Sequence, residues 1–433
     1  MTDPVTLGAR IVRGEQTLTP EIWGGFGDAS PVQAGAGCTV LPGAGNAVLL
    51  DGPAGRILFD TGAAGDAERL VSALAALDGD PVGIIVLSGG DPQSAGGAAA
   101  LSAALMAAGQ PRPTIVARAG IGPRLADLAG GHGFIARNRT DTRADGGPMT
   151  LLHPDIGIEE RMTLGSGDLA CRLSGVGPAG YDQCWLWQPA TRTACIGGLW
   201  RWGFPAVGQP FGPGRSPLDT AQALRAVADM EPEWLIPGYG PPVAGRQQIG
   251  TILRDVATVL EVLTLKARAM IDGGARLNDV LDQVPQIDEP LIAGLRDCAQ
   301  QDRPWLSCFE GEPAFLLRAV WAMTAGWYDG NPAMVKPAPD RALAVELATQ
   351  AGGAPALAFR ARELADAGDL ALACHLIEIA ALAAPETASV HAARAHVYGR
   401  RRDAEPTLAA RTVFADAATA SARVAAALKE AAG

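Results

Sequence analysis

The sequence lacks the features that would place a protein in a membrane or on nucleic acid. It contains no run of about 18 or more apolar residues, so we expect no transmembrane helix. The opening MTDPVTLGARIVRGEQ has no apolar segment of the kind found in signal peptides. Lys and Arg number 35 against 46 Asp and Glu, which gives a net charge of −11, and the basic residues form no stripe. These absences argue against nucleic acid and anionic membranes as partners, and they predict a cytoplasmic protein.

The sequence also lacks the cysteine spacing of a zinc ribbon or a disulfide framework. It has an odd number of cysteines and no Cys-x-x-Cys motif; the seven are Cys38, Cys171, Cys184, Cys195, Cys298, Cys308 and Cys374. Most are expected to be small buried hydrophobic residues. In QCWLWQPATRTACIGG, Cys184 and Cys195 are symmetric about a turn, so they are candidates to face each other across a hairpin. Two reduced core thiols are the preferred interpretation, and a disulfide is the alternative.

What the sequence does contain is an alternation of strands and helices over residues 35–245. Two apolar runs in residues 38–62 flank a Gly/Pro turn and predict a hairpin. A helix over 67–77, a buried strand over 83–90, a helix over 94–109 and a strand over 114–120 follow. Residues 148–200 are rich in β-strand patterns, and a helix over 217–230 precedes a last strand over 233–242. This order predicts an α/β layered domain.

The pattern changes after residue 250. A long amphipathic helix over 251–274 comes first, an aromatic-rich stretch over 303–334 follows, and an Ala-rich series of helices begins near residue 340. The Ala-rich helices form hairpins that resemble tetratricopeptide units. The sequence therefore predicts two domains, over residues 1–255 and 256–433.

Five short segments, in this order, resemble landmarks of the metallo-β-lactamase superfamily: LFDTG, VLSGGDPQSAGG, CIGG, LIPGYGPP and, toward the C-terminus, GWYDGNPA. The last one, with the Ala-rich hairpins, is similar to the dimerisation domain of alkylsulfatase-type members. The resemblance implies an αββα sandwich followed by an all-α helical domain that forms a homodimer. It also implies that the sterol-carrier-like third domain of full alkylsulfatases is absent.

Members of this family hold two zinc ions, which activate a bound water and polarise the scissile ester. The resemblance assigns six positions of this chain to metal ligands: Gly89, Asp91, Gln93, Ser94, Gly198 and Tyr239. Of these residues, only Asp91 has a side chain of the kind that binds zinc in this family. The loop over 174–180, which supplies another ligand in the family, has no His, Asp or Glu. The five histidines, His132, His153, His375, His391 and His396, all lie outside these motifs. Only Asp91 keeps a ligand side chain, so we predict that the protein has no metal cofactor.

Three functions follow from this interpretation. The first is a non-hydrolytic homologue (a pseudoenzyme) that acts as a binding or regulatory subunit and pairs with an active paralogue. The second is an alkylsulfatase-like ester hydrolase with a rebuilt site, in which Asp91, Asp182 and Tyr239 are the candidate acid/base groups. The third is a scaffold that binds a peptide through the C-terminal helix hairpins.

Other residues near these motifs have two interpretations each. Asp60 of LFDTG is either a strand-end anchor beside the cleft or a residue that caps its own turn. The glycine pairs at 89–90 and 96–97 either cradle an anion or allow close backbone approach. The aromatic cluster lines an apolar ligand pocket or belongs to the core; its members are Trp185, Trp187, Trp200, Trp202, Phe204 and Phe211.

Overall fold

The computed structural model describes most of the chain, namely residues 3–17, 19, 26, 30–43, 45–52, 55–130, 153–178, 180–210, 214–284, 290–293, 295 and 302–431. Contacts divide the chain into two compact units. The first comprises residues 1–137, 141–273 and 280–321, and the second comprises 138–140, 274–279 and 322–433. The boundary predicted at residue 255 falls inside the helix α9 (Arg246–Asp272).

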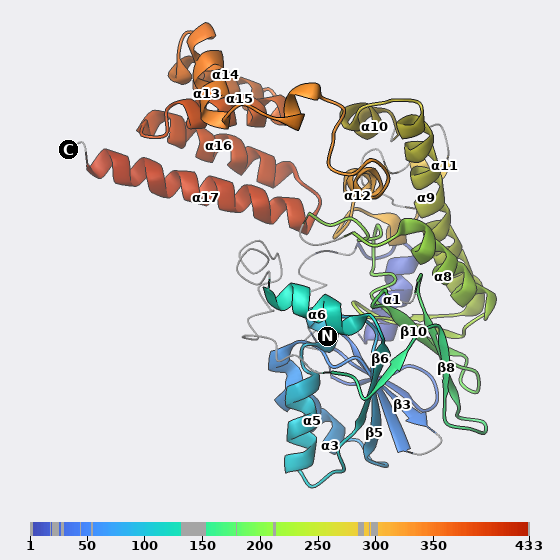
Figure 1. Ribbon diagram of the computed structural model, residues 1–433. Helices are drawn as coiled ribbons and strands as arrows, with labels where there is room; N and C mark the ends of the chain where they lie inside the picture. The colour runs from blue at the N-terminus through green and yellow to red at the C-terminus, as the bar shows by residue number, and fades with distance from the viewer. Residues whose placement is uncertain are drawn as a thin grey trace. The chain divides into compact units, whose positions relative to one another are not determined.

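The first unit begins with the helix α1 (Pro4–Val12), which Asp3 caps, and continues into a seven-stranded sheet in chain order. The strands are β1 (Val32–Gln33), β2 (Cys38–Leu41), β3 (Ala47–Gly52), β4 (Gly55–Phe59), β5 (Val82–Leu87), β6 (Thr114–Arg118) and β7 (Ile156–Ile158). Strands β1 to β4 pair antiparallel, whereas β4 to β7 pair parallel. The helices α3 (Ala67–Ala75), α5 (Ala98–Ala107) and α6 (Ile121–Gly130) make the connections that parallel pairing requires (Figure 1).

A second sheet of six strands has the order β13-β12-β11-β10-β9-β8. The strands are β8 (Arg161–Leu164), β9 (Cys171–Gly175), β10 (Cys184–Gln188), β11 (Thr193–Gly197), β12 (Trp234–Pro237) and β13 (Val243–Ala244). The helix α8 (Pro217–Asp229) connects β11 to its parallel neighbour β12, and it packs against α9. Each sheet thus has helices attached to it, which is the αββα arrangement that the sequence predicted.

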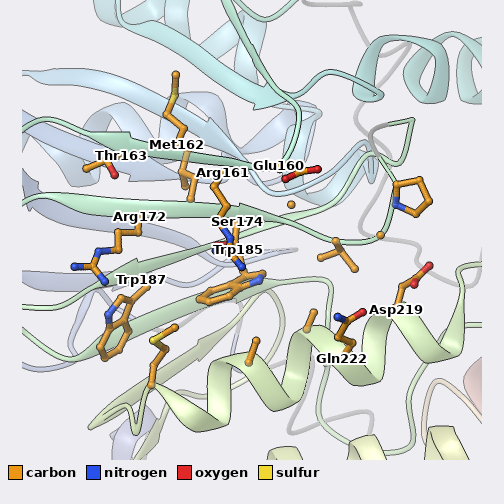
Figure 2. A pocket seen from close by; sticks show the side chains of 18 residues that line it. Glu160, Arg161, Met162, Thr163, Arg172, Ser174, Trp185, Trp187, Asp219 and Gln222 are labelled. Carbon is orange, nitrogen blue, oxygen red and sulfur yellow. The ribbon is translucent and has the colours of Figure 1, made fainter.

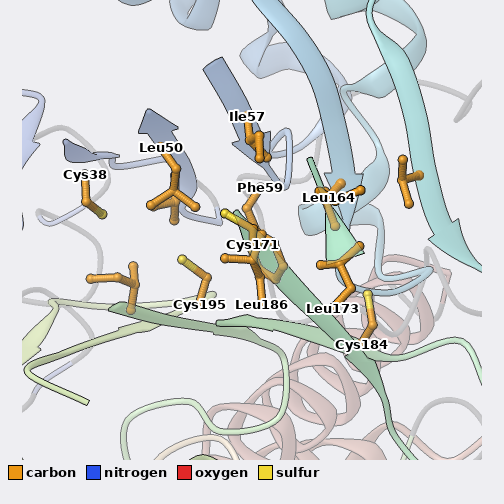
Figure 3. Close-up of a cluster of buried hydrophobic side chains, with 14 of the residues drawn as sticks. Cys38, Leu50, Ile57, Phe59, Leu164, Cys171, Leu173, Cys184, Leu186 and Cys195 are labelled. Atoms are coloured by element: carbon orange, nitrogen blue, oxygen red, sulfur yellow. The ribbon is translucent and has the colours of Figure 1, made fainter. Parts of the chain in front are cut away.

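One hydrophobic core lies between the two sheets and a second lies between the first sheet and its helices. Alternating residues of β10 separate the faces: Cys184 and Leu186 point into the core between the sheets, while Trp185 and Trp187 point away from it. Figure 3 shows four cysteines among the aliphatic side chains of this core. All four are free thiols, and burial raises the pKa of each, to about 12 for Cys38.

The register of the β10–β11 hairpin decides between the two interpretations of its cysteines. Cys195 lies opposite Leu186, not opposite Cys184, and both thiols are free. Cys184 instead lies 3.4 Å from the carbonyl oxygen of Leu87. The preferred prediction of reduced core thiols is therefore confirmed for this pair. Elsewhere in the first unit Cys308 is disulfide-bonded, which the spacing of the cysteines did not predict.

The first unit continues through α10 (Leu277–Gln283), α11 (Pro290–Ala293), a short helix over Pro304–Leu306 and α12 (Pro313–Ala325), parts of which lie at the unit boundary. The second unit is helical, with a short turn over Pro332–Val335 and then α13 (Asp340–Gln350), α14 (Ala354–Asp366), α15 (Leu370–Ala383), α16 (Ala388–Ala404) and α17 (Leu408–Glu430). Its core is built largely of alanine, because small side chains let helices approach closely. Among the described residues, no helix is long and apolar enough to cross a membrane.

Candidate functional site

The segment that follows β5 is tied to the segment that follows β4. The backbone N–H and the hydroxyl of Thr61 both donate to the carbonyl of Ser94, at 2.7 and 3.0 Å. The N–H of Gly97 donates to the carbonyl of Gly62. Asp91 caps the short helix α4 (Pro92–Ala95) that starts in this segment. Two of the landmark motifs, LFDTG and VLSGGDPQSAGG, therefore form one bonded loop pair at the ends of adjacent parallel strands.

Asp60 links the ends of the two strands that carry this loop pair. It is 1% exposed, its φ is +64°, and its carboxylate accepts hydrogen bonds from the backbone N–H and the hydroxyl of Ser88, both at 2.7 Å. Burial raises the pKa of Asp60 to about 7, although the bonds from Ser88 act in the opposite direction. Asp60 thus joins two strand ends and does not cap its own turn, which corrects one of the two sequence interpretations. Gly197 lies against Ser88, where a Cβ would come within 2.2 Å of the hydroxyl.

A buried arginine contacts two of the positions that the resemblance assigns to metal ligands, Asp91 and Tyr239. The guanidinium of Arg201 lies 3.7 Å from the ring centroid of Tyr239, pairs with Asp91, and forms an ion pair of 3.0 Å with Glu310. The side chain of Arg201 is 12% exposed and Tyr239 is 2% exposed. Burial acts to lower the pKa of Arg201, but the neighbouring Tyr239, Glu310 and Asp91 outweigh it and raise that pKa. Burial likewise raises the pKa of Tyr239 well above its ordinary value, so the phenol stays protonated.

A second arginine lies beside the glycines that replace the other ligands. The guanidinium of Arg215 is 3.6 Å from a carboxylate oxygen of Asp182, which also accepts a 2.9 Å hydrogen bond from the N–H of Gly90. A Cβ on Gly198 would lie 3.2 Å from Arg215, and one on Gly89 would lie 3.8 Å from it. Of the two, only a Cβ at Gly198 would crowd Arg215, since 3.8 Å is an ordinary contact distance.

A third arginine holds the loop from which the family takes another ligand. Arg118, at the end of β6, has no exposed surface. Its guanidinium donates to the carbonyls of Gly177, Pro178 and Tyr181, at 3.0, 2.5 and 3.4 Å. Gly175 lies directly against it, since a Cβ there would meet the guanidinium at 2.0 Å. The loop is thus fixed by one cation through its backbone, without any side-chain ligand.

These residues do not fit a zinc site. Among the described residues, no group of three or more His, Cys, Asp or Glu side chains is placed to hold a metal ion. The side chains at the family's ligand positions are already engaged: Asp91 with Arg201, and Tyr239 beneath the same guanidinium. A zinc ion placed there would face fixed positive charge where it needs imidazole and carboxylate donors.

The three candidate acid/base residues do not form one set. Asp91 and Tyr239 both contact Arg201, whereas Asp182 belongs to the neighbouring pair with Arg215. Sequence reasoning missed Arg118, Arg201, Arg215 and Glu310. The sequence did contain one signal that could have found the arginines: they occur in the loops next to the positions that lack metal ligands.

The structure distinguishes between the two interpretations of the glycine pairs and of the aromatic cluster. The N–H of Gly90 donates to Asp182, and the amides of the 96–97 pair donate to backbone carbonyls, so these glycines serve close packing and do not cradle an anion. Trp200 and Trp202 are core residues, 1% and 0% exposed, with ring centroids 5.3 Å apart. Phe204 is buried as well, and Phe211 and His132 lie outside the described residues. Trp185 and Trp187 line a groove elsewhere in the first unit.

Two protein families match parts of this chain. Residues 40–160 match the metallo-beta-lactamase superfamily, and residues 298–423 match the alkyl sulfatase dimerisation family. Each of these matches covers less than a third of the chain. The loss of the metal ligands stays a prediction from the sequence, in which Asp91 alone keeps a ligand side chain at the assigned positions.

Two relatives bear on the branch within the superfamily. An (R)-specific secondary-alkylsulfatase of Pseudomonas sp. is 29% identical over 143 residues, which cover 33% of this chain and 20% of that protein. The solved structure of the stereoselective inverting sec-alkylsulfatase Pisa1 from Pseudomonas sp. is 18% identical and aligns with a TM-score of 0.77. That alignment covers 92% of this chain and 66% of the Pisa1 chain, and a double mutant of Pisa1 aligns with a TM-score of 0.75. The shared property is the fold.

Proposed function

We propose that this chain is a non-hydrolytic relative of the alkylsulfatases, a binding or regulatory protein whose cleft is held by arginines where its relatives hold zinc. The observation that carries the proposal is the position of Arg201, stacked on Tyr239 and paired with Asp91 and Glu310. Two of these three contacts, with Asp91 and Tyr239, use residues at positions that the resemblance assigns to metal ligands.

Chemical differences between a guanidinium and a zinc ion support this proposal. Zinc keeps an open coordination position and lowers the pKa of the water bound there to about 7, which supplies the nucleophile. A guanidinium carries fixed charge and donates hydrogen bonds, but it has no position at which a water can be ionised. Two carboxylates and an aromatic face already saturate Arg201, so its charge is not available to a scissile ester.

Metal content and turnover test this proposal together. Protein purified without a histidine tag, loaded with zinc and dialysed should retain fewer than about 0.1 zinc ions per chain. It should not hydrolyse secondary alkyl sulfates, phosphodiesters or thioesters, with or without added zinc. Stoichiometric zinc together with turnover would contradict the proposal. Turnover without zinc would instead favour the rebuilt hydrolase, and loss of that turnover in Asp91→Asn, Asp182→Asn or Tyr239→Phe would identify its catalytic group.

We also propose that the chain forms a homodimer through its second unit. Its helices bury alanine, and the unit exposes large apolar side chains: Leu343 and Phe359 on helices at 55% and 66%, and Trp327 in the turn after α12 at 75%. Apolar surface of this kind marks an interface in a protein that stays in solution. The match to a dimerisation family favours a second copy of this chain as the occupant over a peptide.

Sedimentation equilibrium tests the self-association. The chain has a mass of 44.4 kDa, and we expect a species of twice that mass at micromolar concentration. Replacing exposed apolar residues, as in Leu343→Ser with Phe359→Ser, should raise the dissociation constant at least about tenfold, because each removes roughly 1.5–3 kcal/mol of apolar burial. Ala418→Ser, a change of a small residue that packs against the alanine core, is the control for altered folding. A monomer at all concentrations would contradict a homodimer.

A further inference from the structure

A groove lies between the outer face of the second sheet and α8, with the loop over 174–178 at its border, and we propose that it binds an aromatic anion. Its volume is about 680 Å³, within the range of small-molecule sites. Figure 2 shows its lining side chains, which come from β8, β9, β10 and α8. All of them belong to the first unit.

Strand register explains which side chains line the groove. On β10, β9 and β8, Trp185 lies opposite Ser174, which lies opposite Arg161. The next row with side chains on the same face is Trp187, Arg172 and Thr163. Because alternate residues of a strand share a face, both rows point away from the core between the sheets. The result is two indole rings beside two guanidinium groups on one surface.

The helix α8 lies above this surface and lines the groove partly with small side chains. Residues of α8 that line the groove follow helical spacing and include the small side chains Ala223 and Ala226. The bulkier Leu224 and Val227 lie on the buried side of the helix, which packs against α9. Small side chains on α8 therefore create the space above the two tryptophans, which are 4% and 5% exposed at its floor.

The charges in the groove point to an anion. Arg161 and Arg172 are diagonal neighbours on adjacent strands, a position with Cβ atoms about 7–8 Å apart. Among the described residues, neither guanidinium has an ion pair or a side-chain hydrogen bond, although most other arginines of the first unit do. An anionic group between them would offset their repulsion and accept their hydrogen bonds.

The distribution of charge also sets the orientation of the ligand. Figure 2 shows Arg172 beside Trp187 at one end, Arg161 beside Trp185 near the middle, and Glu160 and Asp219 toward the other end. A carboxylate or sulfonate would therefore lie between Arg172 and Arg161, on the side away from Asp219. The aromatic body would lie against the apolar lining of the groove, to which the indoles contribute only small exposed areas.

Calorimetry with three probes that share one ring system tests the proposal: 1-naphthalenesulfonate, 1-naphthalenemethanol and 1-naphthylmethylammonium. We expect the sulfonate to bind about tenfold more tightly than the alcohol, and the ammonium to bind most weakly. In Arg161→Gln with Arg172→Gln, the sulfonate should fall to the affinity of the alcohol. Arg341→Gln with Arg411→Gln, the same change of net charge in the second unit, is the matched control and should have no effect.

A second variant separates the groove from other places where the probe can bind. Ala226→Phe fills the space above the tryptophans, and it should abolish binding of both the sulfonate and the alcohol while thermal unfolding stays cooperative. Equal affinity of all three probes, no binding at millimolar concentration, or undiminished sulfonate binding by the double glutamine variant would each overturn the proposal. Loss of binding only in Arg215→Gln would place the probe in the family's cleft and would also overturn it.

Discussion

Replacing Arg201 with methionine should destabilise the first unit by about 3–5 kcal/mol, the largest loss that we expect from any single change at the cleft. Methionine keeps much of the volume but leaves the carboxylates of Asp91 and Glu310 without their cation. These carboxylates are 23% and 15% exposed, so water can solvate them only in part. Arg201→Lys should lose an intermediate amount, because an ammonium cannot bridge two carboxylates and stack on Tyr239 at the same time.

Urea unfolding followed by tryptophan fluorescence measures this loss, since Trp200 and Trp202 are buried in the same unit. The matched control is Arg254→Met, which breaks an ion pair with Asp229 whose side chains are 50% and 71% exposed. That change should cost less than about 1 kcal/mol. Addition of a chelator should not alter the unfolding midpoint of the wild-type protein. A loss below about 1 kcal/mol in Arg201→Met would show that the arginine does not replace the metals as the link between these loops.

The parts of the fold that depend on local patterns could be predicted from the sequence. The sequence predicts a strand over 83–90 and a helix over 94–109, and the structure has the strand β5 (Val82–Leu87) and the helix α5 (Ala98–Ala107) there, with bounds that differ by a few residues. The landmark motifs gave the order of the elements around them. The hairpin cysteines needed one more fact, the register, because a shift of two residues separates Cys195 from Cys184 without changing the hydrophobic pattern.

The composition of the cleft could not be predicted in the same way. Arg201 lies 110 residues from Asp91 and 109 from Glu310 along the chain, and no periodicity relates positions that far apart. The loss of ligands was visible at each motif, because a glycine or serine stands where a histidine is expected. The side chains that occupy the positions of the missing ligands could not be predicted, because they come from loops that are far apart in the sequence. The same limit applies to Trp185 and Trp187. Strand alternation predicts that their side chains share one face of the sheet. It does not predict the groove above them, which depends on how α8 packs.

Asp60→Asn should change how stability depends on pH. Burial raises the pKa of Asp60 in the folded state to about 7, against an ordinary value of 3.8. Between these two values the folded state binds more protons than the unfolded state, so the contribution of Asp60 to stability is greatest below about pH 4, decreases as pH rises, and is constant above about pH 7. Between pH 5 and pH 8 the wild-type protein should therefore lose roughly 2–3 kcal/mol relative to the asparagine variant.

Asparagine is a fair replacement because it can keep the local contacts. Its carbonyl can accept from the N–H of Ser88, its amide can donate to the hydroxyl, and asparagine tolerates the positive φ of this position. Urea midpoints of both proteins at pH 5 and pH 8 give the comparison, with Asp168→Asn on an exposed turn as the control that should parallel the wild type. Ser88→Ala should deepen the loss at pH 8, because the bonds from Ser88 favour the charged carboxylate. If the wild-type and Asp60→Asn profiles are parallel, Asp60 does not titrate in this range, and the two strand ends are joined by a permanently charged carboxylate.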